Sequence, residues 1–167
     1  SITTGDSNTF FGHQSGDATT TASNNTGVGK DALGANTTGA QNTALGHSAG
    51  AAVTTAVNTV AIGYQAGDAN TTGTNNTAMG YLALDANTTG TVSVAIGDAA
   101  LSANTTASGN VAVGANSQLN TTTGTGNVSI GYASLQANTT ATNNTGLGYT
   151  ALAANTTGIQ NTAVGSL

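Results

Sequence analysis

Few side chains in this chain are suited to acid–base or metal chemistry. The sequence contains two histidines, His13 and His47, six aspartates, one lysine and no cysteine. The aspartates do not form the Gly-Gly-x-Gly-x-Asp pattern of calcium-binding repeats. Residues 27–29 form a lone Gly-x-Gly, which does not make a phosphate-binding loop. We therefore expect a protein that is not an enzyme and has no metal ion and no cofactor.

Four tyrosines recur directly after a glycine and could bind a ligand through their rings. They are Tyr64, Tyr81, Tyr132 and Tyr149, and the two members of each pair are 17 residues apart. An exposed ladder of such rings could stack on sugars, as aromatic faces do in binding sites. Alternatively, each ring packs along a neighbouring repeat or a neighbouring chain. The sequence leaves both interpretations open.

Asparagine and threonine recur in the phrase Ala-Asn-Thr-Thr, and we expect both to face outward as two polar columns. Such columns suggest either ice binding, in which ordered hydroxyl and methyl groups match an ice lattice, or an ordinary hydrated surface. The same asparagines open Asn-Thr-Thr sequons, which predict N-glycosylation where the source glycosylates asparagine. The array comprises Asn36, Thr38, Asn70, Thr72, Asn87, Thr89, Asn104, Thr106, Asn138, Thr140, Asn155 and Thr157, and the sequons begin at Asn36, Asn70, Asn87, Asn104, Asn138 and Asn155.

The composition excludes several classes of partner. Only 4% of the residues are charged and the net charge is -5, so no basic surface is available to bind nucleic acid or an anionic membrane. No apolar run reaches the roughly 18 residues of a membrane span, and we expect no direct membrane insertion. Because there is no cysteine, disulfides do not stabilise the fold.

A repeat of 17 residues positions all of these side chains. A glycine closes each repeat, at residues 12, 29, 46, 63, 80, 97, 114, 131, 148 and 165, with no insertion or deletion. We number each repeat from position 1, which follows one closing glycine, to position 17, which is the next. An unbroken period is typical of a repeat architecture, so we expect one domain over residues 1–167.

Within the repeat, the alternation of residue classes predicts strands. Position 14 is Thr or Val, position 15 is small and position 16 is apolar, as in Thr43-Ala44-Leu45. We expect a strand there, with positions 14 and 16 in the core and position 15 outside. A second strand is expected over positions 6 to 10, with even positions such as Ala35 and Thr37 facing inward.

Two strands and two turns per repeat predict an all-β fold, a parallel β-solenoid of ten coils stacked in register. Each coil adds about 4.8 Å, the spacing of neighbouring strands. His13 and His47 share position 1 two coils apart, hence about 10 Å, which is too far to share one metal ion. The small side chains of positions 15 and 3 are expected to lie near the axis of a trimer. The position-3 column includes Ala32, Ala49, Ala66, Ala83, Ala100 and Ala151.

Two segments depart from the repeat. Residues 118–120 place a leucine one position late, and a one-residue bulge is expected to return Leu119 to the core. Ile2, Phe10 and Phe11 add bulk that is expected to plug the N-terminal end, with Phe11 in the usual core position. Because neither end carries a distinct polar cap, we expect either a piece of a longer protein or end-to-end stacking.

The phrases Asn-Thr-Ala-x-Gly, Tyr-x-Ala-Leu and Ala-Asn-Thr-Thr-Gly, joined as in residues 149–165, resemble repeats of phage tail-fibre and bacterial surface proteins. The variants at residues 94–97, 110–114 and 127–131 are also similar to the head repeat of trimeric autotransporter adhesins. Those heads are left-handed parallel β-rolls of three chains, with a slightly shorter repeat. The resemblance implies an extracellular fibre or adhesin, a homotrimer and left-handed coils.

From the sequence we expect a structural and adhesive module outside the cell, either the shaft of a fibre or a receptor-binding head, on a virion or a cell surface. Its expected partners are other copies, in a homotrimer or end to end, and a cell-surface glycan or protein receptor. An ice-binding solenoid and a self-stacking filament subunit are the two alternatives.

Overall fold

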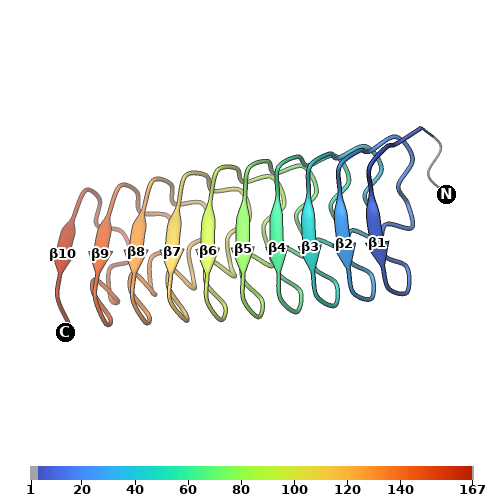
Figure 1. The fold of residues 1–167 in the computed structure, drawn as a ribbon. Helices are drawn as coiled ribbons and strands as arrows, with labels where there is room; N and C mark the ends of the chain where they lie inside the picture. The colour runs from blue at the N-terminus through green and yellow to red at the C-terminus, as the bar shows by residue number, and fades with distance from the viewer. Residues whose placement is uncertain (1–3, 167) are drawn as a thin grey trace.

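The computed structural model describes residues 4–166, which form a single rod of stacked coils (Figure 1). Ten three-residue strands make one parallel sheet, in which each strand pairs with its neighbours in the chain. The strands are β1 (Thr9–Phe11), β2 (Thr26–Val28), β3 (Thr43–Leu45), β4 (Val60–Ile62), β5 (Thr77–Met79), β6 (Val94–Ile96), β7 (Val111–Val113), β8 (Val128–Ile130), β9 (Thr145–Leu147) and β10 (Thr162–Val164). The fold is an all-β parallel β-solenoid, as predicted.

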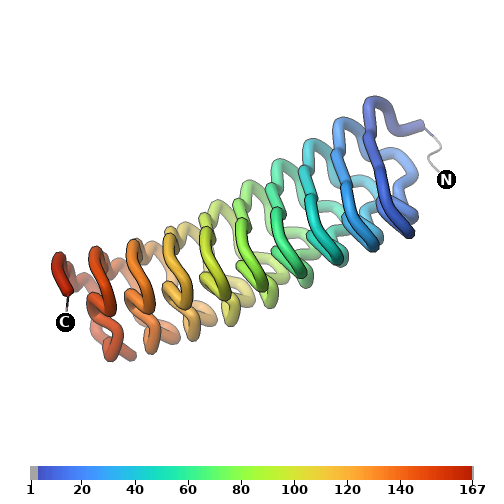
Figure 2. The backbone as a smooth tube through the Cα atoms, turned by 60° about the horizontal axis from the view of Figure 1, so that its bottom comes forward, coloured from blue at the N-terminus to red at the C-terminus, as the bar shows by residue number. Residues whose placement is uncertain are grey.

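Neighbouring coils are related by a shift of 17 residues, and this register is kept along the rod. β2 and β3, for example, pair Thr26 with Thr43 and Val28 with Leu45. The strands at the front of Figure 1 run downward while the chain advances from right to left, so the coils wind left-handed. Figure 2 shows the same stack with its lower side brought forward.

Within residues 4–166 each coil has one strand, not the two that were predicted. Over positions 6 to 10 the backbone makes a less regular contact with the next coil. The amides of Thr37 and Thr38 both donate to the carbonyl oxygen of Thr54, at 3.0 and 3.2 Å. A parallel ladder has evenly spaced hydrogen bonds, so this sharing of one carbonyl interrupts the strand pattern.

The core of the sheet is formed by small side chains at position 15, which shows that the predicted orientation of the strands was wrong. Ala44 and Ala95 are 0% exposed, whereas Leu45 is 48% exposed and Ile96 is 36% exposed. The position-15 methyl groups pack against the alanines of position 3 and the leucines of position 4 in a narrow interior. Beside the strand there is room for little more than a methyl group, so positions 14 and 16 face solvent. Four leucines of position 4 are buried in the same interior: Leu33, Leu84, Leu101 and Leu135.

In the remainder of the coil, every third residue faces inward rather than every second. Asn36, Gly39 and Asn42, at positions 7, 10 and 13, are buried. Ala35 and Thr37, which were predicted to face the core, are only half-buried. Because this segment turns and is not a regular strand, the alternation of a strand does not apply to it.

At the N-terminal end, Phe10 rather than Phe11 contributes to the core. A Cβ atom added to Gly16 would lie 2.5 Å from atoms of the Phe10 ring, so the ring occupies space that Gly16 leaves free. Phe11 is 77% exposed, and its predicted core placement was wrong. Ile2 lies outside the described residues.

Gln118 occupies position 4, and the coil keeps its register without the predicted bulge. The side chain is 0% exposed. Its Nε2 donates to the carbonyl oxygen of Val111 and to Oγ of Ser129, both at 2.9 Å. These hydrogen bonds satisfy the buried Nε2, whereas Oε1 is buried without a hydrogen-bond partner among the described residues. Leu119 therefore stays half-buried at position 5 and does not return to the core.

Substitutions in β5 test which side of the strand is core. Ala78 is 0% exposed, so Ala78→Leu is expected to overfill the interior and lower the free energy of unfolding by about 1–3 kcal/mol. Thr77→Leu, at the adjacent outward position, is the matched control and should change that free energy by about 0.5 kcal/mol or less. Urea unfolding followed by circular dichroism measures both. A greater loss for Thr77→Leu would mean that the outward face had been misassigned.

Candidate functional site

The titratable side chains do not gather into a catalytic or metal-binding cluster. Within residues 4–166, no group of three or more His, Cys, Asp or Glu side chains is placed to hold a metal ion. Lys30 forms an ion pair with the adjacent Asp31. The hydrogen bond from Lys30 holds the pKa of the Asp31 carboxyl below its usual value. The repeated surfaces of the rod are therefore the candidates for function.

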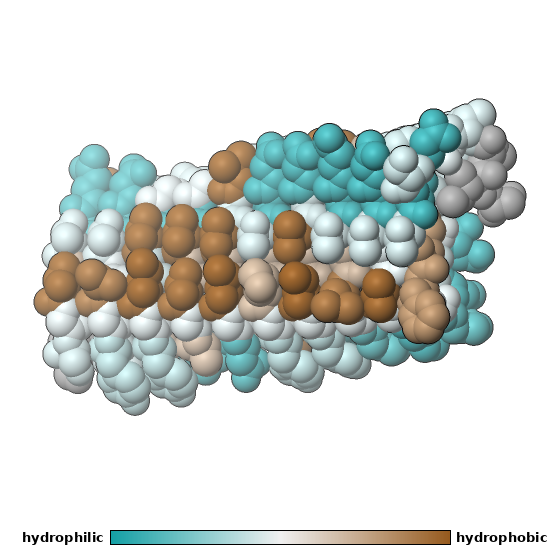
Figure 3. Space-filling model, in the orientation of Figure 1, coloured by the Kyte–Doolittle hydropathy of each residue, from teal (hydrophilic) through white to brown (hydrophobic). Residues whose placement is uncertain are grey.

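One side of the rod carries a band of exposed apolar side chains on the outer face of the sheet. Position 16 is apolar in every strand, and position 14 adds valine in β4, β6, β7 and β8. Figure 3 shows the band as brown rows that run along the rod, from one strand to the next. We call it the apolar strand face. Its most exposed members are Phe11, Leu45, Met79, Ile96, Ile130, Leu147 and Val164.

A signal in the sequence could have identified this face. Strand alternation separates two sets of side chains but does not say which set is inward. Position 15 is restricted to Ala, Gly and Ser in β2 to β10, whereas position 16 varies among Val, Leu, Ile and Met. A close-packed interior tolerates little change in side-chain volume. The column with the narrower range of sizes is therefore the core.

The small-residue columns that were expected near a trimer axis are part of this core. Ala32, Ala49 and Ala66 at position 3 are 0% exposed, as are Ala44 and Ala95 at position 15. They cannot contact another chain, and the prediction was wrong. A close approach of another chain to the sheet would use positions 14 and 16 instead.

The tyrosines stack on one another along the rod. His47, Tyr64 and Tyr81 form one run, with ring centroids 5.3 and 5.4 Å apart and planes within 14° of parallel. Tyr132 and Tyr149 form a second stack, with centroids 5.3 Å apart. The structure therefore favours packing along neighbouring coils over sugar stacking, because the inner ring faces already cover each other. Only the two outer faces of each stack are free of another ring among the described residues.

The asparagines of the predicted surface array face inward. Asn36, Asn70, Asn87, Asn104 and Asn138 are 0% exposed. Each side chain closes its own turn, as when Asn36 Nδ2 donates to the carbonyl oxygen of Gly39 at 3.0 Å. The prediction that these asparagines face outward was therefore wrong. Their burial also argues against glycosylation of the folded chain at these sequons.

Asn155, in the last coil, is half-buried and makes the same turn contact. Its Nδ2 donates to the carbonyl oxygen of Gly158 at 2.9 Å. The amide of Gly158 donates back to Asn155 Oδ1 at 3.1 Å. The hydrogen bonding of the turn thus accounts for this asparagine also.

The threonines of the array do face outward. Position 9 is an exposed threonine in every coil, and we call this set the threonine column. Position 8 differs, because its hydroxyls are bonded to the next coil: Thr37 Oγ1 donates to the carbonyl oxygen of Thr54 at 3.1 Å, and Thr71 Oγ1 to that of Thr88 at 3.0 Å. The threonine column comprises Thr4, Thr21, Thr38, Thr55, Thr72, Thr89, Thr106, Thr123, Thr140 and Thr157.

Asp68 and Asp85 occupy position 5 of adjacent coils and are half-buried. Burial raises the pKa of both carboxyls. For Asp85, backbone amides of Asp85 and Ala86 partly counter this rise, and the charge of Asp68 adds to it. Ionisation therefore costs more in the folded chain than in the unfolded one. This cost is absent at pH values below the pKa of the unfolded chain, near 3.8, and grows as the pH rises through the pKa of the folded chain.

Removing these two carboxylates is expected to stabilise the rod at neutral pH. The double variant Asp68→Asn with Asp85→Asn should melt at a higher temperature than the natural chain, and should gain less stability on acidification. Asp17→Asn is the control, because Asp17 is an exposed residue at position 5 of another coil, and it should change the melting temperature little. Thermal unfolding at neutral and mildly acidic pH measures the difference. A lower melting temperature for the double variant at neutral pH would contradict the expectation.

Comparisons with protein-family models, curated proteins and solved structures found no match for this chain. Over the described part of the chain, no helix has the length and apolar character needed to cross a membrane. Function must therefore be inferred from the surfaces of the rod itself.

Proposed function

We propose that the chain is a non-enzymatic module of an extracellular fibre or adhesin, whose copies associate side by side through the apolar strand face. The observation that carries this proposal is the exposure of an apolar residue at position 16 in coil after coil, with Leu45 at 48% and Ile130 at 41%. Soluble monomers rarely leave a large continuous apolar surface uncovered, and such surfaces usually mark an interface.

A second copy of the same chain is the partner that fits this face. The side chains recur once per coil, about every 4.8 Å, over the length of the sheet. Another copy presents rows with the same spacing, so the two sets can interdigitate along the whole rod. Charge does not oppose this contact, because positions 14 and 16 contain no charged residue.

The number of chains is proposed from the resemblance to trimeric adhesin heads. Each coil has one apolar face, and three rods can each direct that face toward a common axis. The remaining sides of each rod then stay available for a glycan or protein receptor. Such a bundle suits a fibre shaft or a receptor-binding head.

Light scattering after size-exclusion chromatography tests the assembly. The natural chain is expected at three times its 15.9 kDa mass. Replacing two members of the apolar strand face, Ile96→Asn with Ile130→Asn, should give monomers with unchanged circular dichroism. Thr89→Asn with Thr123→Asn, in the threonine column, is the matched control and should remain trimeric.

Two results would refute lateral assembly. One is a natural chain that stays monomeric at every concentration examined. The other is a trimer that persists when both isoleucines have been replaced, since the apolar strand face would then not form the contact.

The threonine column supports a second candidate function, binding to ice. Its ten hydroxyl and methyl groups form a regular exposed row, and within residues 4–166 no side-chain hydrogen bond to protein uses the hydroxyls of Thr38, Thr72 or Thr89. With the asparagines buried, the surface that could order water is this row and not the paired columns first expected.

Thermal hysteresis of the purified protein tests the ice-binding candidate. Ice binding predicts a freezing point below the melting point, and this gap should be lost in Thr72→Tyr with Thr89→Tyr. Thr77→Tyr, on the apolar strand face, should retain the gap. The absence of hysteresis at millimolar concentration would remove ice binding and leave lateral assembly untouched.

A further inference from the structure

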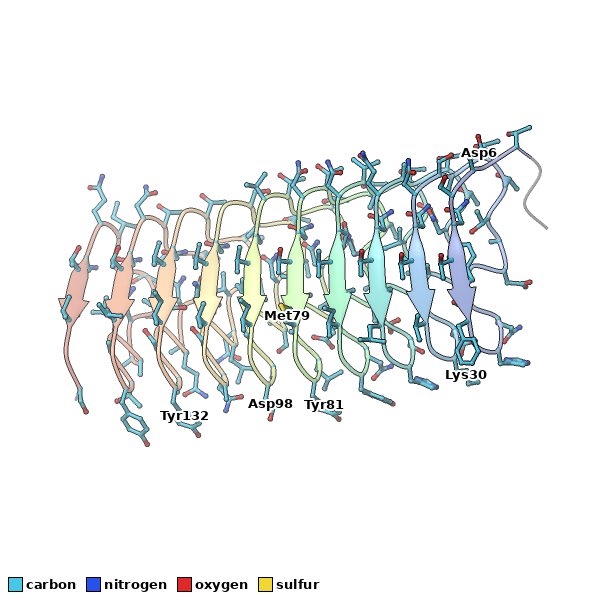
Figure 4. The ribbon with its side chains drawn as sticks, viewed as in Figure 1. Asp6, Lys30, Met79, Tyr81, Asp98 and Tyr132 are labelled. Atoms are coloured by element: carbon cyan, nitrogen blue, oxygen red, sulfur yellow. The ribbon has the colours of Figure 1, made fainter. Side chains whose placement is uncertain are left out.

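Position 1 forms an exposed column along one edge of the sheet, and one coil interrupts its bulky side chains. Of its ten members among residues 4–166, eight are histidine, lysine, tyrosine or aspartate, and the other two are Ala115 and, in the incomplete last coil, Ser166. In Figure 4, Asp98 lies between Tyr81 and Tyr132 along the lower edge of the strands. We call the space outside Ala115, between Asp98 and Tyr132, the Ala115 slot.

Backbone hydrogen bonds fix the three residues that border this slot. The amide of Asn116 donates to the carbonyl oxygen of Asp98, and that of Ala133 to the carbonyl oxygen of Ala115, both at 2.9 Å. Asp98, Ala115 and Tyr132 therefore occupy successive coils, about 4.8 Å apart. A group held over Ala115 has a carboxylate one coil away on one side and an aromatic ring one coil away on the other.

The ring of Tyr132 offers one open face to this slot. Its other face stacks on Tyr149, with centroids 5.3 Å apart. The open face is directed toward Ala115, whose side chain ends at Cβ and cannot cover it. Tyr132 is 48% exposed, so a ligand can reach the ring from solvent.

The carboxylate of Asp98 is exposed and has no ion-pair partner among residues 4–166. The chain has a single lysine or arginine, Lys30, and that residue pairs with Asp31. The net charge of -5 adds to the negative potential at this edge. Asp98 thus presents an uncompensated negative charge beside an open aromatic face.

We propose that the Ala115 slot binds an organic cation of the trimethylammonium type, as found in choline. A cation within about 6 Å of a tyrosine ring is attracted by the negative face of the ring, and a carboxylate on the opposite side adds Coulombic attraction. The carboxylate of Asp98 and the open face of the Tyr132 ring both attract positive charge. Neither of them is a hydrogen-bond donor. A neutral sugar, which needs donors as well as acceptors, is matched less well. One carboxylate is also too few ligands for a calcium ion.

Titration with choline chloride, followed by NMR of the Ala115 methyl group and the tyrosine rings, tests the slot. Weak, saturable binding that falls as salt is raised is expected. The neutral isostere of choline, in which tert-butyl replaces trimethylammonium, should not bind. Asp98→Asn and Tyr132→Leu should each weaken choline binding by roughly three- to tenfold.

Ala115→Tyr provides the sharpest variant, because it fills the slot with the residue that the following coil carries at this position. It is expected to keep the fold, to join Tyr132 in the stack and to abolish choline binding. Tyr64→Leu, in the other stack, should bind choline as the natural chain does. These readouts apply to a monomer or an oligomer, so they do not depend on lateral assembly.

Three outcomes would overturn the proposal: equal binding of the neutral isostere, unchanged binding in Ala115→Tyr, or saturable binding of a neutral saccharide at this slot in place of choline. Where choline does bind, phosphatidylcholine vesicles identify its source. Co-sedimentation that Ala115→Tyr abolishes would indicate a lipid headgroup. Choline binding without co-sedimentation would indicate a soluble or polymer-linked cation, and either result retains the slot.

Discussion

Neighbouring coils approach each other closely at the closing glycines, and the rest of the rod depends on this contact. A Cβ atom added to Gly63 would lie 2.4 Å from the carbonyl oxygen of Gly80, and the φ angle of Gly63 is +134°. Both facts exclude a side chain: the first by overlap with the next coil, the second because this backbone conformation strains any L-residue. The contact sets where each strand ends, and it holds successive strands at hydrogen-bonding distance.

A tight corner and a short coil leave a narrow interior, and its width decides which repeat positions can hold large side chains. Position 15 contributes little more than a methyl group to the core, as at Ala61, which is 1% exposed. Polar side chains help to fill the remaining space, and many of their groups are hydrogen-bonded. Asn42 Nδ2 donates to the carbonyl oxygen of Ala56 at 2.8 Å, and the amide of Asn42 donates to Asn25 Oδ1 at 2.9 Å. The larger aliphatic residues of positions 14 and 16 lie on the outer side of the strands and form the apolar strand face.

The 17-residue period was sufficient to predict the fold, the register and the coil boundaries, because all three follow from repetition alone. The direction in which each side chain points was harder to predict. Hydropathy predicts that Ile96 rather than Ala95 faces the core, and it gives no reason to bury Thr38 or Asn36. The narrow coil nevertheless buries Ala95 and Asn36. Volume and hydrogen-bond geometry outweighed hydropathy at both positions. The stacking of Tyr132 on Tyr149 followed from register, but the open face beside Ala115 required the structure.

Differences among coils of one chain separate structural columns from candidate functional ones. The threonine at position 8 is constant for a visible reason, since hydroxyls such as that of Thr88 bond the next coil at 3.0 Å. The threonine at position 9 is equally constant, but among residues 4–166 the hydroxyls of Thr38, Thr72 and Thr89 make no hydrogen bond to the next coil, so such a bond does not account for its constancy. Position 1 shows the opposite behaviour. Its register is fixed by backbone hydrogen bonds, while its side chains change from tyrosine to aspartate to alanine. A rigid column with variable side chains can hold a local site without loss of stability of the fold.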